Sequence, residues 1–142
     1  MNYDDLVALN DPLEVGTRIA KAALDSQSDG TIESGEEREI AAKLVAWIID
    51  QPPSVVPTPD DIARKSIELI IAEVTLTEIT DKLRSGVMDR QERSRTEQGV
   101  RDAAEVMASK AKLSTTGATQ AEITHAIQQG IEVLVDIYGG SL

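Results

Sequence analysis

The sequence predicts an all-α fold: a compact bundle of about five helices in a single domain that covers residues 1–142. Apolar residues recur at spacings of three and four, the pattern of helices with one buried face. Pairs such as Ser34 with Glu37 and Thr119 with Glu122 are typical of helix starts, because each side chain can bond the other's backbone N–H. Phe is absent and hydrophobic residues make up 41% of the chain, so the predicted core is aliphatic.

The first two helices are expected at residues 11–24 and 35–50, after a short lead of ten residues. Asp11 and Pro12 supply a cap and a favourable first helical position for the first helix. In the second, the residues Ile40, Leu44, Trp47 and Ile48 form an apolar stripe, and Trp47 is expected to anchor the core.

Residues 51–59 contain four of the five prolines and predict a stiff, extended crossover between two helical layers. The third helix is expected at residues 60–84. Its β-branched density raises strand propensity, and a capping pattern at Thr75 and Glu78 leaves open whether the helix is continuous there.

The last two helices are expected at residues 88–113 and 120–138. Residues 89–99 contain no apolar side chain, which predicts an exposed surface. From Val100 the apolar pattern resumes through Val106 and Met107, so these residues are expected to form a buried face.

The formal net charge of −11 argues against general nucleic-acid binding through phosphates. The charge is uneven: residues 1–80 carry 16 acids and 6 bases, whereas residues 81–113 carry 6 acids and 8 bases. We therefore expect Arg90, Arg93 and Arg95 to form the surface that contacts a partner protein. Without cysteine, thiolate metal sites and disulfides are excluded. No apolar run is long enough to span a membrane, and the expected location is the cytoplasm.

Residues 25–36 have a spacing that indicates chemistry rather than packing. Oxygen-bearing side chains fall at loop positions 1, 3, 5, 9 and 12, and Gly30 at position 6 allows a sharp turn. This order resembles an EF-hand calcium loop, in which about six to eight oxygens surround the ion. The resemblance implies a calcium site formed by Asp25, Gln27, Asp29, the Thr31 carbonyl, Glu33 and Glu36.

The same loop departs from the EF-hand pattern at two positions. Gln27 lowers the ligand charge, and Glu37 stands where EF-hands place a large apolar residue. The core from Asp29 to Glu36 also resembles the Asp-Gly-x-Ile-x-x-x-Glu turn of the TerB-like helical domains of tellurite resistance, which implies a metal-binding helix–helix turn. A capped acidic turn that binds no metal explains the same residues.

No catalytic motif stands out. His125, the one histidine, shares a helical face with Glu122, but a di-iron bundle requires a second such pair. The expected protein is therefore not an enzyme but a small acidic binding module with a calcium loop. The alternative is a structural adaptor of phage or plasmid type, without metal, which acts through protein contacts. A weaker alternative is an acidic inhibitor that mimics nucleic acid, and self-association stays open.

Overall fold

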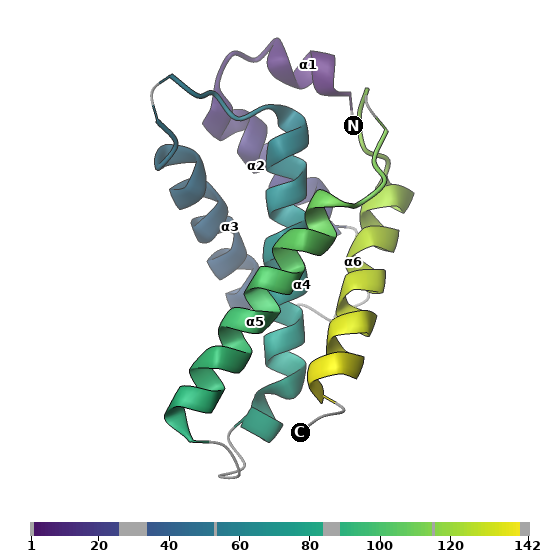
Figure 1. Cartoon of the computed structure of the whole chain (residues 1–142). Coiled ribbons are helices and arrows are strands. Elements are labelled where there is room, and N and C mark those ends of the chain that lie inside the picture. Colours follow the sequence, from purple (N-terminus) through teal and green to yellow (C-terminus); the bar gives the residue numbers. More distant parts are fainter. Residues whose placement is uncertain (1, 26–33, 53, 84–88, 115, 140–142) are drawn as a thin grey trace.

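The all-α prediction is confirmed by a computed structural model of the chain, in which residues 2–25, 34–52, 54–83, 89–114 and 116–139 are described (Figure 1). The described residues form helices and connections without a strand. The helices are α1 (Tyr3–Val7), α2 (Pro12–Asp25), α3 (Ser34–Ile49), α4 (Pro59–Leu83), α5 (Arg90–Ser109) and α6 (Gln120–Leu134), and α6 continues into the π-helical segment η1 (Val135–Gly139).

Helix α4 is the centre of the bundle. It contacts every other helix, and α2, α3, α5 and α6 surround it (Figure 1). Its isoleucines on several faces are buried, among them Ile62, Ile67, Ile70 and Ile71. The other helices need only one buried stripe each, and α5 contributes the small residues Val100, Ala104 and Ala108.

The helices begin where side chains accept hydrogen bonds from unpaired backbone N–H groups. At the start of α2, Asp11 Oδ1 accepts from the N–H of Leu13 at 3.1 Å. The Asp89 side chain caps α5, and Thr119 forms a complete capping box at the start of α6. These caps explain why the predicted helix starts lie within two residues of the observed ones.

The third helix is continuous: α4 runs without interruption from Pro59 to Leu83. The β-branched residues that raised strand propensity are buried, including Ile70, Val74 and Thr75. Burying an aliphatic side chain contributes about 1.5–3 kcal/mol, whereas helix propensities differ by only about 0.7 kcal/mol per residue. Packing on all sides therefore decides the conformation of this segment.

The prediction that Trp47 lies in the interior is wrong. The residue is half-buried at the edge of the core. Ile40, Leu44 and Ile48 occupy the face of α3 that points inward, and this leaves the indole ring on the flank of the helix. There the Lys65 ammonium lies 5.9 Å from the ring centroid, a cation–π distance.

The ten-residue lead contains a short helix that the sequence did not predict. Tyr3 and Leu6 of α1 are buried, and the Tyr3 N–H donates to the Thr116 carbonyl at 2.8 Å. Helix α5 ends at Ser109 rather than near residue 113. Arg64 Nη1 lies within hydrogen-bond distance of the carbonyls of Ala108, Ser109 and Ala111 and thereby caps this end.

Candidate functional site

Helices α2 and α3 flank the acidic loop in the order that a helix–loop–helix site requires. Asp25 is the last residue of α2 and is exposed, and Glu36 lies in the first turn of α3. The other expected ligands, Gln27, Asp29, Thr31 and Glu33, lie outside the described residues. Within the described part of the chain, no three acidic or histidine side chains gather to hold a metal ion.

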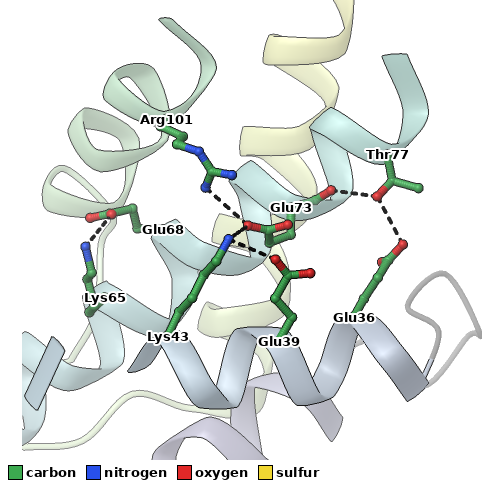
Figure 2. Close-up of polar contacts among 8 residues, drawn as sticks. All are labelled: Glu36, Glu39, Lys43, Lys65, Glu68, Glu73, Thr77 and Arg101. Atoms are coloured by element: carbon green, nitrogen blue, oxygen red, sulfur yellow. Dashed lines mark hydrogen bonds and ion pairs between the residues drawn. The ribbon is translucent and has the colours of Figure 1, made fainter. Parts of the chain in front are cut away.

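The Glu36 carboxylate faces α4 (Figure 2). Its Oε1 atom lies 3.0 Å from the Thr77 hydroxyl, which also lies 2.9 Å from the Glu73 carbonyl of its own helix. Its Oε2 atom is buried and has no hydrogen-bond partner among the described residues. Asp25 instead shares a groove of about 390 Å³ between α2 and α3 with the neighbouring Glu37. Glu36 is thus the ligand candidate with a vacant acceptor, and one of its oxygens already contacts α4.

A network of charged side chains ties three helices together beside Glu36 (Figure 2). Glu73 of α4 pairs with Lys43 of α3 and, at 3.1 Å, with Arg101 of α5. Lys43 also pairs with Glu39 at 3.3 Å. The Glu73 side chain is only 12% exposed, so two cations compensate one nearly buried carboxylate. This network joins α3, α4 and α5, and its four charged side chains pair with one another.

The first half of α5 forms the exposed surface that its lack of apolar residues predicted. Arg90 and Arg95 are exposed and Arg93 is half-buried. None of the three forms an ion pair with a described residue, in contrast to Arg64 and Arg101. Arg90 and Arg95 line a shallow hollow on this surface. We call these three residues the arginine surface.

A cleft of about 780 Å³ lies between the end of α5 and the start of α6. Val106 lines it and is 51% exposed, so the expectation that Val106 belongs to the buried face is wrong. No pattern in the sequence had predicted this cleft. One sequence feature could have indicated a binding surface here. No acidic residue stands three or four positions before Lys110 or Lys112, so neither lysine has an ion-pair partner at helical spacing.

His125 and Glu122 both line the cleft, but Glu122 is occupied. Its carboxylate accepts from the Thr119 N–H at 2.8 Å and from the Ser114 hydroxyl at 3.0 Å. The Thr119 backbone N–H, helped by the Ser114 hydroxyl, holds the pKa of the Glu122 carboxyl below its usual range. A carboxylate held in this way stays ionised and serves as a helix cap.

Comparison with known proteins adds no identity: no family model, no curated protein and no solved structure matches this chain. The resemblances to EF-hand and TerB-like turns therefore stay predictions. None of the described helices combines the length and the apolar character needed to cross a membrane.

Proposed function

We propose that this protein is a noncatalytic adaptor that binds a partner protein through the arginine surface of α5. The observation that carries the proposal is that these arginines, unlike others in the chain, form no ion pair with a described residue. Arg90, Arg93 and Arg95 have no ion-pair partner among the described residues, although the chain has a net charge of −11. In a chain so rich in carboxylates, guanidinium groups left unpaired on a polar helix are available to carboxylates of another molecule.

A site-specific crosslinker tests this proposal. A photoreactive amino acid at the exposed Gln91, which lies in the same hollow as Arg90 and Arg95, should form a protein adduct in cells of the source organism. Replacing Arg90, Arg93 and Arg95 with Ala should remove the adduct and leave the melting temperature within about 1–2 °C, because exposed charges contribute little stability.

Lys21 and Arg38 provide the matched control, since both are exposed and without an ion pair among the described residues. Replacing them with Ala should leave the adduct intact. An adduct that survives the triple arginine substitution, or one that consists of nucleic acid, contradicts the adaptor proposal. A large loss of stability would show that the arginines hold the fold instead.

A second function, divalent-cation binding by the turn between α2 and α3, is favoured by Glu36. Its Oε2 atom is buried, no described residue supplies it with a hydrogen bond, and a cation would satisfy it. Calcium is the first candidate, with Asp25, Gln27, Asp29, the Thr31 carbonyl and Glu33 as the other ligands. Gln27 and the lack of a second loop imply a weak Kd, on the order of 10⁻⁴ to 10⁻³ M.

Calcium titration by calorimetry and thermal unfolding tests this second proposal. At about 10 mM calcium and a Kd of about 1 mM, binding to the folded state alone adds about 1.4 kcal/mol of stability. Glu36→Gln should abolish this gain. Thr77→Val should strengthen calcium binding, because it frees Oε1 from the contact with α4. Without a calcium-dependent shift in the parent protein, Glu36 serves only to join α3 to α4.

A further inference from the structure

The cleft between α5 and α6 has an apolar floor that a single soluble chain leaves uncovered. Val106 is 51% exposed, and Met107 and Ala126 are half-buried beside it. The cleft is open to solvent along the two helices rather than closed around a small ligand, which would be buried over most of its surface. Such a groove is suited to an amphipathic helix, whose apolar ridge lies along the floor. A methionine in the floor adapts its shape to a partner.

The free charges at the rim of the cleft are positive. Lys110 and Lys112 are exposed and form no ion pair with any described residue. Glu122 is the acidic residue among the cleft's lining side chains, and its carboxylate is held by Thr119 and Ser114. An acidic segment would therefore meet two available ammonium groups, whereas most of this chain's surface would repel it.

The two lysines are not needed to complete the end of α5. Cations often stand at this end of a helix because they offset the partial negative charge of the last carbonyls. Here Arg64 already performs that task, since its Nη1 atom lies 2.9 Å from the Ala108 carbonyl and 2.8 Å from the Ala111 carbonyl. Lys110 and Lys112 are thus available to another molecule.

We propose that this cleft docks an acidic amphipathic helix of a partner protein. The apolar ridge of that helix packs on Val106, Met107 and Ala126, and its carboxylates pair with Lys110 and Lys112. This inference extends the adaptor proposal and rests on its claim that the chain binds protein. The cleft and the arginine surface consist of different residues. Arg95 of the arginine surface and Val106 of the cleft are about 16 Å apart along α5.

A phage-displayed library of helical peptides of about 14 residues provides the probe, since this length covers the cleft with a turn to spare on either side. Selection on the folded protein should enrich Leu, Ile or Met at helical spacing, flanked by Asp or Glu. The enriched peptide, labelled and titrated by fluorescence polarisation, should bind the Lys110→Glu/Lys112→Glu variant at least tenfold more weakly. Val106→Asp should have a similar effect.

Two residues that occur once in the sequence locate the binding event. His125 is the single histidine and lines the cleft, so its imidazole NMR signals should shift on titration with the selected peptide. Trp47 is the single tryptophan and lies outside the cleft, so its indole signals should stay in place. A peptide that shifts Trp47 and not His125 overturns the assignment of the cleft.

Lys21→Glu/Arg38→Glu is the control matched for charge, because Lys21 and Arg38 are exposed on α2 and α3 and the two substitutions change the net charge by the same amount as the lysine variant does. It should leave peptide affinity within about twofold of the parent, since neither residue lines the cleft and exposed charges are screened by salt. Enrichment of basic or uncharged peptides, or equal losses in Lys21→Glu/Arg38→Glu and the lysine variant, overturns the inference. The crosslinking result at Gln91 is independent of all these outcomes, so failure of the cleft and failure of the adaptor proposal are distinguishable.

Discussion

Gly130 brings α6 close to α4, and Gly130→Ala tests how tightly the bundle is packed. A Cβ atom at this position would lie 2.9 Å from Ile71 Cγ1 and 3.3 Å from Ile71 Cγ2, and it would also meet Cδ1 of the same side chain. Ile71 is fully buried, so it has no space into which to withdraw. The two helices must then separate locally, or Ile71 must leave its preferred rotamer.

The magnitude follows from two opposing terms. Adding a methyl group to a filled core costs about 1–3 kcal/mol, and the upper half of that range applies because three atoms of one buried side chain are involved. Alanine has a helix propensity about 0.8–1 kcal/mol better than glycine. The expected net destabilisation is therefore about 1–2 kcal/mol, measured as the free energy of unfolding in urea with circular dichroism as the signal.

Gly35→Ala is the matched control, because a Cβ atom at Gly35 in α3 would meet nothing within 4 Å. Only the propensity term applies there, so stability should stay unchanged or rise by up to about 1 kcal/mol. Adding Ile71→Val to Gly130→Ala removes the nearest atom and should recover part of the loss, which gives a favourable coupling energy in a double-mutant cycle. Stabilisation by Gly130→Ala alone would refute the close approach of the two helices.

Three further predictions concern the charged network around Glu73, Trp47 at the edge of the core, and Glu122 at the start of the last helix. Glu73→Gln should cost about 1–2 kcal/mol in urea unfolding, with a smaller cost at about 1 M salt, because two bases lose a partly buried partner. Trp47→Ala should cost about 1.5–3 kcal/mol, less than a fully buried Trp would, as measured by thermal and urea unfolding. Glu122 has a lowered pKa in the folded protein, so its contribution is present above the ordinary value of 4.5 and is lost as pH falls through the folded pKa. The difference in melting temperature between the parent and Glu122→Gln should therefore shrink from about pH 7 to about pH 3.

The helix starts were predictable because their determinants are local. The side chains of Asp89 and Thr119 act on backbone N–H groups within three residues of themselves, and that relation can be read from adjacent letters. The ends were harder. The end of α5 depends on Arg64, which lies 44 residues earlier in the chain than Ala108, and no local pattern contains that contact.

The interior was predictable in type and less so in detail. A stripe of apolar residues shows which face of a helix is buried, but the width of the buried sector depends on the helices opposite. Trp47 and Val106 were both assigned to apolar stripes from their spacing, and both fall outside the sector that the neighbouring helices cover. The cleft could not be predicted for the same reason, because it depends on the relative positions of α5 and α6.

The candidate sites differ in how far the sequence could reach them. The exposure of the arginine surface follows from composition alone, since a segment without apolar residues has nothing to bury. The hydrogen-bond partner of Glu36 cannot be predicted from composition, because Thr77 lies 41 residues away and contacts Glu36 across the α3–α4 interface. A loop pattern specifies which oxygens are available, and the tertiary structure decides which of them are already occupied.

The division between a largely buried α4 and a more exposed α5 explains why the proposed binding surfaces lie on α5. Most of α4 packs against other helices, so a substitution such as Ile71→Ala changes the fold before it changes any surface. The buried stripe of α5 is narrow and consists of Val100, Ala104 and Ala108, so most of its positions carry little of the stability. Substitutions there can alter charge and shape at low cost to folding. The bases on α5 and just beyond its end, which form no ion pair with a described residue, are therefore free to serve the contacts proposed above without cost to the bundle.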